Sequence, residues 1–163
     1  MSSPWTVRVR QVVEFLTRHP DPEDERWALD ALPEELRPLY RRMRPYDRYH
    51  CTGVARRFAA LQPPAWALQG ALLHDCGKPP GFGLLARILG VLFPDPGVQA
   101  DPPARHPVRR IQQVYRWHGE YGARLARAAG LCDEGCELIA NHHARGSRVD
   151  GSWLARFQAV DDD

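Results

Sequence analysis

The sequence predicts an all-α fold, and three observations support that prediction. Apolar residues recur at intervals of three and four over most of the chain, which is the period of an amphipathic helix. No segment alternates apolar and polar residues as a half-buried strand does. The chain has 163 residues and 44% hydrophobic content, enough for one domain with a substantial core. We therefore expect residues 1–163 to form a single helical domain.

Helix boundaries in the N-terminal third are indicated by prolines, acidic residues and apolar spacing. Asp21 followed by proline has the form of an N-cap with proline in the first turn, and it predicts a helix through Trp27. Pro33 followed by two glutamates opens another helix, because acidic residues favour a first turn. A longer helix over about 46–61 carries His50 on its apolar stripe. The first segment has an apolar helical face made of Val9, Val12, Val13 and Leu16.

The rest of the chain is also predicted to be helical. Two prolines at 63–64 open a helix that Gly77 and the prolines at 79–80 stop. A Pro-rich loop is expected over 94–107. The other predicted helices span about 81–93, 108–117, 118–129, 133–143 and 152 to the C-terminus.

Composition disfavours several classes of protein. The net charge is only +2 and no run of like charges stands out, so there is no strong signal for nucleic-acid binding. The longest apolar stretch, 81–93, is interrupted by Arg87 and is shorter than the roughly 20 residues that span a bilayer. No signal peptide is recognisable, so we expect a cytoplasmic protein without membrane association. Four cysteines lack metal-site spacing and are interpreted as reduced, mostly buried thiols: Cys51, Cys76, Cys132 and Cys136.

Asp75 is the first candidate for chemistry. It is predicted to lie in the last turn of a helix, where the helix dipole disfavours a negative charge. The preceding leucines indicate burial, and a buried carboxylate needs a partner. A bound cation would keep Asp75 ionised, whereas an ordinary helix end with a solvated aspartate is the alternative.

The histidines are the second candidates. His50, His74, His118 and the pair His142–His143 lie in predicted helices or at their ends, beside apolar residues. Each alone is also compatible with a structural role. His19 and His106 lie next to prolines and are expected at the surface. Together, histidine and aspartate supply the nitrogen and oxygen donors that divalent transition metals accept.

Five segments occur in an order that resembles the HD-domain phosphohydrolase superfamily. They are RYHCTGVARRF, ALLHDCGK, HGEYGARLARAAGL, ELIANHHARG and FQAVDDD. The resemblance covers 46–163 and implies a helical bundle of the HD-domain type over that range. Residues 1–45 would then be an N-terminal helical extension.

The resemblance implies one or two divalent metal ions. One ion would be held by His50, His74, Asp75 and Asp161. The second would share Asp75 as a bridge and add His118 and His142, with His143 as a further candidate. Asp161 is preferred over the two aspartates that follow it because it directly follows an apolar pair. The expected metals are Fe, Mn, Co, Ni or Zn, with Mg as an alternative.

The activity implied is hydrolysis of a phosphate ester or anhydride by metal-activated water. The expected partner is a small phosphorylated substrate, and a nucleotide or dinucleotide is favoured. Asp75 and Lys78 are the candidate catalytic residues. Lys78 is the only lysine in the chain, and it could also bind the substrate phosphate or simply favour a helix end. Arg145 and Arg148 are further candidates for substrate binding, although solvated surface arginines are the simpler interpretation.

Some features depart from known branches of that superfamily. The Gly-Tyr-Pro element of cyclic-di-GMP phosphodiesterases is absent after His143, which disfavours that substrate. Tyr46 stands where three-metal members carry a glutamate, so no third metal is expected. The segment 78–118 is long and is expected to form a substrate-specific lid. The HGxxGA spacing also resembles bacterial diadenosine-tetraphosphate hydrolases. Two alternatives stay open, an HD-type di-iron oxygenase and a non-catalytic nucleotide-binding module.

Overall fold

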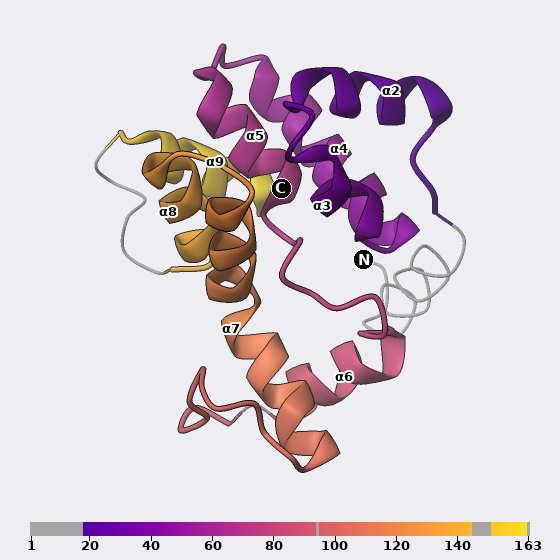
Figure 1. The fold of residues 1–163 in the computed structure, drawn as a ribbon, viewed down its shortest axis with the longest axis vertical. Helices are drawn as coiled ribbons and strands as arrows, with labels where there is room; N and C mark the ends of the chain where they lie inside the picture. The colour runs from indigo at the N-terminus through magenta and orange to yellow at the C-terminus, as the bar shows by residue number, and fades with distance from the viewer. Residues whose placement is uncertain (1–17, 94, 145–150, 163) are drawn as a thin grey trace, which may run out of the picture.

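The computed structural model describes residues 18–93, 95–144 and 151–162. Within these ranges the regular elements are all α-helices and no strand occurs, which confirms the all-α prediction. The helix predicted around Val9 to Leu16 lies outside the described residues. The helices are α2 (Pro22–Ala31), α3 (Arg37–Arg42), α4 (Pro45–Ala59), α5 (Ala65–Leu73), α6 (Leu84–Leu92), α7 (Pro107–Ala128), α8 (Asp133–Asn141) and α9 (Trp153–Asp161) (Figure 1).

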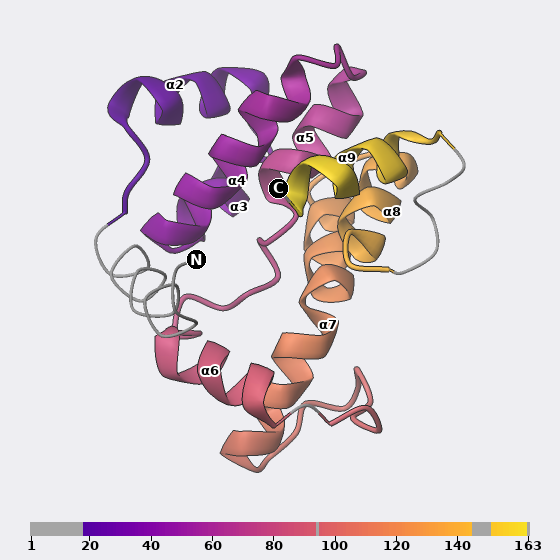
Figure 2. The same ribbon diagram turned by 180° about the vertical axis from the view of Figure 1, so that it is seen from behind.

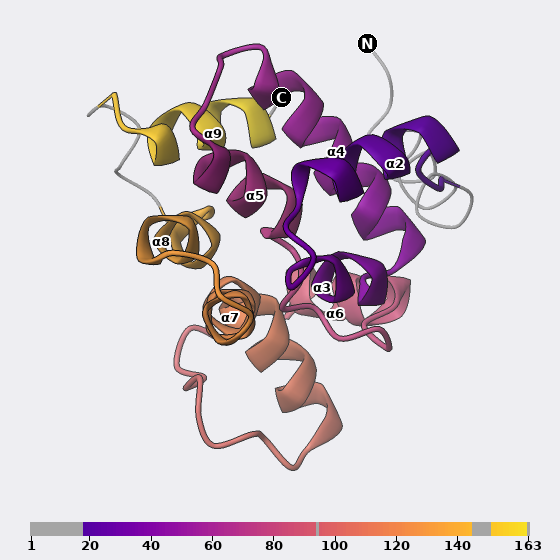
Figure 3. The same ribbon diagram turned by 45° about the horizontal axis from the view of Figure 1, so that its top comes forward.

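The helices form a bundle from which one part projects. In Figures 1 and 2, α6 and the N-terminal half of α7 extend away from the other helices. Helix α5 lies at the centre of the bundle, in contact with α2, α3, α4, α8 and α9 (Figure 3). Its sequence, AWALQGALL, is apolar nearly all round, as expected for a helix covered on every side. The residues directly after α5 are therefore held in the middle of the molecule.

Described residues before the expected domain core pack into the same hydrophobic interior. Leu32, Leu36 and Tyr40 are buried in one cluster with α4 and α5. The Tyr40 hydroxyl lies 2.8 Å from Thr52 Oγ1 on α4. Asp21 caps α2 by accepting a hydrogen bond from the backbone of Glu23, as the sequence predicted. Helices α2 and α3 are thus part of the bundle.

Helix α9 is docked by aromatic packing and by one amide. The ring of Phe58 on α4 meets Trp153 and Phe157 of α9 edge to face, with centroids 5.9 and 5.5 Å apart. The side-chain amide of Gln158 donates to the backbone oxygens of Asn141 and Ala144, at 2.9 and 3.0 Å. These contacts place the last residue of α9 against α4 and α5.

Hydrogen bonds from side chains of α7 hold the Pro-rich segment that follows α6. The buried amide of Gln113 donates to the carbonyl oxygens of Gln99, Ala100 and Pro102 at 2.8, 3.0 and 2.9 Å. The Trp117 indole donates to the Val98 carbonyl at 2.9 Å. Within the segment 78–118 that was expected to form a lid, residues 98–102 are therefore tied to the α7 surface by side-chain hydrogen bonds.

Several predicted boundaries were wrong. The two helices expected over 108–117 and 118–129 are one continuous helix, α7, because no residue between them breaks the backbone hydrogen bonding. Helix α5 ends at Leu73, so Asp75 lies in the turn just beyond it. Helix α6 begins only at Leu84, after Gly83 as its N-cap. Among the helices that the structure describes, none is both long enough and apolar enough to cross a bilayer.

Candidate metal centre

The candidate ligands come from five helices or their ends and meet beside α5. His50 projects from α4, and His74 and Asp75 occupy the turn that follows α5. His118 lies in the middle of α7, and not at the start of a helix as predicted. The other ligand candidates are His142 and His143, directly after α8, and Asp161, the last residue of α9.

The cluster is buried except at His50 and His143. His74, Asp75, His118 and His142 are each exposed by 4% or less. The side chain of Asp161 is 7% exposed and that of His50 35%. His143 is exposed. His50 and His143 are thus the members of the cluster that are accessible to solvent.

Three imidazoles are fixed in the same way. The Nδ1 atoms of His74, His118 and His142 lie 2.8, 2.9 and 2.7 Å from backbone carbonyl oxygens three residues earlier in the chain. A carbonyl oxygen can only accept, so Nδ1 carries the proton and donates it. With the proton on Nδ1, the Nε2 atom of each ring points into the cluster, as a metal-binding imidazole requires.

One group of donor atoms gathers around Asp161. Its Oδ1 lies 3.3 Å from His50 Nε2 and 3.6 Å from His74 Nε2. Asp75 Oδ2 lies 3.9 Å from the same nitrogen of His74. Two carboxylates and two imidazoles therefore surround one point between α4, α5 and α9. Asp162 is exposed and Asp163 lies outside the described residues.

A second group gathers on the other side of Asp75. Its Oδ1 lies 3.5 Å from His118 Nε2 and 4.0 Å from His142 Nε2. The two nitrogens are 3.2 Å apart, and their lone pairs repel unless a proton or a cation lies between them. The His143 ring stacks on His142 with centroids 4.0 Å apart. Asp75 thus presents one carboxylate oxygen to each group.

Lys78 forms an ion pair with the carboxylate of Asp75. Its Nζ lies 2.6 Å from Asp75 Oδ1, and its side chain is only 13% exposed. The lysine is therefore directed into the cluster and does not extend into solvent as a helix-end cation would. Arg145 and Arg148, the other predicted substrate-binding residues, lie outside the described residues.

The donor set fits a divalent transition metal. Asp75 Oδ1 and Asp161 Oδ1 are buried, and they face the Lys78 ammonium at 2.6 Å and the His50 imidazole at 3.3 Å. A buried carboxylate is costly without a cationic partner, and a coordinated metal ion would supply one to both carboxylates. Two triplets have all their ligand atoms within 4.8 Å of one another: His50, His74 and Asp75, and His118, His142 and His143.

Burial and charge keep these groups in their metal-binding forms. Burial, together with the nearby charge of Lys78, lowers the pKa of His118 to about 3. Burial and the surrounding imidazoles hold the pKa of His142 well below its usual range. For Asp75, burial alone would raise the pKa, but Lys78 and the imidazoles outweigh it and lower the pKa well below its usual value. Neutral imidazoles and an ionised carboxylate are the states that ligate metals.

Glycines allow the elements that carry the ligands to approach closely. A Cβ on Gly77 would lie 1.9 Å from the carbonyl oxygen of His118 and 2.5 Å from the nitrogen of Gly122. A Cβ on Gly119 would lie 2.8 Å from the carbonyl oxygen of Ala140. The turn after α5, helix α7 and helix α8 are therefore in backbone contact at the site, which brings His118 to Asp75.

Sequence reasoning did not identify the close backbone contacts at these glycines or the place of Cys51 beside the site. The sulfur of Cys51 is buried and lies 3.8 Å from His74 Nε2. Cys51, Cys76 and Cys136 are buried free thiols and Cys132 is an exposed one, as expected for mostly buried, unpaired cysteines. The position of Cys51 directly after His50 was the only available signal, and a buried thiol beside a histidine is unremarkable in a helix.

Comparison with protein families gives one match. The model of the HD domain family matches residues 48–156, a segment that contains His50, the turn after α5, and the histidines of α7 and α8. Comparisons with curated proteins and with solved structures found no significant match. The family expected from the motifs is thereby confirmed.

We predict that Gly77→Ala lowers the free energy of unfolding by at least about 3 kcal/mol, because the added methyl group would overlap backbone atoms that cannot rotate away. Gly81→Ala is the matched control, since a Cβ there meets no atom within 4 Å. Urea denaturation of both variants checks the difference. Equal stability of the two variants would contradict the close backbone contact at Gly77.

We also predict that the chelator-treated protein loses stability as the pH falls below about 6.5. The pKa of His118 is about 3 in the folded state and near 6.5 when unfolded, so between these values only the unfolded chain binds the proton. Between these two pKa values, His118 thus changes the free energy of unfolding by up to about 1.4 kcal/mol per pH unit. Urea denaturation at several pH values measures this effect. The free energy of unfolding should depend less steeply on pH in His118→Gln than in the wild type, and as steeply as in the wild type in the exposed control His106→Gln. An unaltered dependence in His118→Gln would show that this ring is not held neutral.

Proposed function

Since the chain belongs to the HD domain family, we propose that it hydrolyses a phosphate ester or anhydride and that its substrate is a nucleotide or dinucleotide. The family places the chain in a superfamily of metal-dependent phosphohydrolases. The single observation that carries the proposal is the convergence of fixed imidazole Nε2 atoms on two buried carboxylates, those of Asp75 and Asp161.

The geometry supports two metal positions that share Asp75. His50, His74 and Asp161 would hold one ion together with Asp75 Oδ2. His118 and His142 would hold the other together with Asp75 Oδ1, with His143 at its exposed edge. When bound in such a pair, divalent ions polarise a phosphoryl group and lower the pKa of water.

Lys78 is proposed to bind the substrate phosphate. Its Nζ already lies at the centre, where it is paired with Asp75. Because a cation coordinated by Asp75 would compensate the same carboxylate, the ammonium group would become available to an anionic substrate. A compact ammonium acts as a point charge and does not require the planar geometry of an arginine.

Asp75 and the imidazoles have positioning roles in this scheme. The backbone hydrogen bonds at Nδ1 hold three rings in one orientation, so the site is arranged before the substrate arrives. Substrate would approach from the solvent-accessible residues of the cluster, His50 and His143. The buried floor excludes water from the far side of the cluster.

We predict that wild-type protein purified without chelator contains two divalent ions, and that Asp161→Ala and His118→Ala each retain about one. Each variant removes a ligand of one position and leaves the other position intact. Elemental analysis measures the result, with the exposed His106→Ala as the control that keeps both ions. Unchanged metal content in His118→Ala would remove the second position and leave a mononuclear enzyme.

We further predict hydrolysis in a screen of nucleotides, dinucleotides and simple phosphoesters with Mn, Fe, Co, Ni, Zn or Mg. Lys78→Ala should keep its metal content but turn over about a hundredfold more slowly, as expected for loss of one charge-stabilising group. Lys78→Arg tests whether the point charge is needed. Metal loss in Lys78→Ala would show that the lysine is structural.

Failure of the whole screen would favour one of two other functions. Oxygen consumption by the iron-loaded protein would identify a di-iron oxygenase, since that chemistry uses nearly the same ligands. Nucleotide binding without turnover would identify a non-catalytic module.

A further inference from the structure

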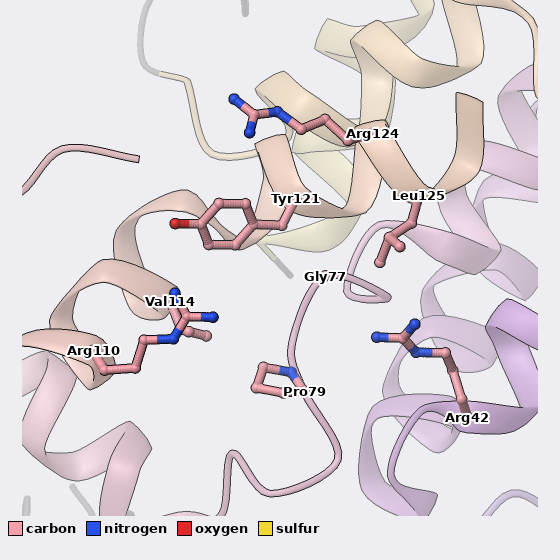
Figure 4. A pocket seen from close by; sticks show the side chains of 8 residues that line it. All are labelled: Arg42, Gly77, Pro79, Arg110, Val114, Tyr121, Arg124 and Leu125. Carbon is pink, nitrogen blue, oxygen red and sulfur yellow. The ribbon is translucent and has the colours of Figure 1, made fainter. Parts of the chain in front are cut away.

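A pocket of about 360 Å³ lies between α3, α7 and the turn after α5 (Figure 4). Its volume falls within the range of sites for small molecules. Three arginines line it: Arg42 from α3, and Arg110 and Arg124 from α7. Pro79, Val114 and Leu125 supply apolar surface. The pocket thus combines positive charge with an apolar wall.

The turn after α5 separates this pocket from the candidate metal centre. Gly77 and Pro79 line the pocket, whereas Lys78 between them directs its Nζ to Asp75. The backbone of Gly77 packs so tightly against α7 that a Cβ would lie 1.9 Å from the carbonyl oxygen of His118. No space is therefore left there between the turn and α7, and the candidate metal ligands are not among the pocket residues.

The three arginines differ in how their charges are compensated. Arg124 lies 2.7 Å from Asp101 Oδ2 and 3.1 Å from Glu120 Oε1, so its charge is offset. Arg110 donates to the neutral Gln113 side chain at 2.8 Å, and no ion pair to a described carboxylate is found for it. Arg42 makes neither a hydrogen bond nor an ion pair within the part of the chain that the structure describes.

Two guanidinium groups that form no ion pair with a carboxylate of the described residues therefore line the same pocket. Figure 4 shows Arg42 and Arg110 directed from opposite sides toward the stretch that carries Gly77 and Pro79. The pocket thus has a guanidinium group on each of two opposite sides, and a guanidinium is well suited to bidentate contacts with phosphate oxygens. Arg44 helps to build this wall, since its Nη1 donates to the carbonyl oxygen of Pro80 at 3.2 Å.

We propose that this pocket is a second binding site, distinct from the metal centre, for a nucleoside phosphate. Arg42 and Arg110 bind its phosphate groups, and the surface of Val114, Tyr121 and Leu125 receives the nucleoside. The Tyr121 hydroxyl is held by the Ala100 carbonyl at 2.6 Å, which fixes the ring as one side of the pocket. The inference does not depend on hydrolysis at the metal centre.

Isothermal titration of the metal-loaded full chain tests the site with two probes, inorganic pyrophosphate and the hydrolysis-resistant methylene analogue of ADP. The double variant Arg42→Gln, Arg110→Gln removes both charges. Arg109→Gln is the matched control, since Arg109 lies on the same helix, is exposed, and has its Nε 3.8 Å from Asp95 Oδ2. Lys78→Gln reports binding at the metal centre. Elemental analysis must give wild-type metal content for the double variant and for Arg109→Gln.

The expected result is a binding event that persists in Lys78→Gln and Arg109→Gln but weakens at least about tenfold in the double variant, since one charged hydrogen bond is worth roughly that factor. Wild-type affinity in the double variant would overturn the proposal. So would loss of all binding in Lys78→Gln, which would place the probes at the metal centre. Absence of binding to the wild type would also overturn it. None of these results decides whether the protein hydrolyses phosphoesters, which the hydrolysis screen tests separately.

Discussion

The carboxylate of Asp75 is the constraint around which the rest of this structure is arranged. It is buried at the centre of the bundle, where an isolated negative charge is unfavourable. Imidazoles from α5, α7 and α8 and the ammonium of Lys78 surround it, and each of its oxygens faces a different group. The charge is tolerated only because these elements meet at one point.

That meeting depends on small residues and on backbone carbonyls. Gly77 and Gly119 remove the side chains that would hold the turn, α7 and α8 apart. Hydrogen bonds from Nδ1 to carbonyl oxygens one turn earlier then orient the rings of His74, His118 and His142. The positions of the donor atoms thus depend on both the close packing and the ring orientation. A shift of α7 or α8 would move a donor atom away from Asp75.

The turn after α5 links two regions of different character. Lys78 faces the acidic centre, while Gly77 and Pro79 face a pocket lined by arginines. A ligand in the proposed second site would therefore touch residues on either side of the lysine. The two regions are thus separated by backbone packing but are joined by consecutive residues of the chain.

Local patterns in the sequence determined the helical class, most of the helices and the family, since helical periodicity, proline positions and motif order are encoded within short segments. They could not show that α7 is continuous through His118, because packing against α8 stabilises the helix across Gly119. Nor could they show the ion pair of Lys78 with Asp75, or that Arg42 and Arg110 share a pocket. With 22 basic residues and a single lysine, an individual arginine carries no sequence signal. Only the tertiary structure decides which charges meet, because that depends on distances between segments far apart in the chain.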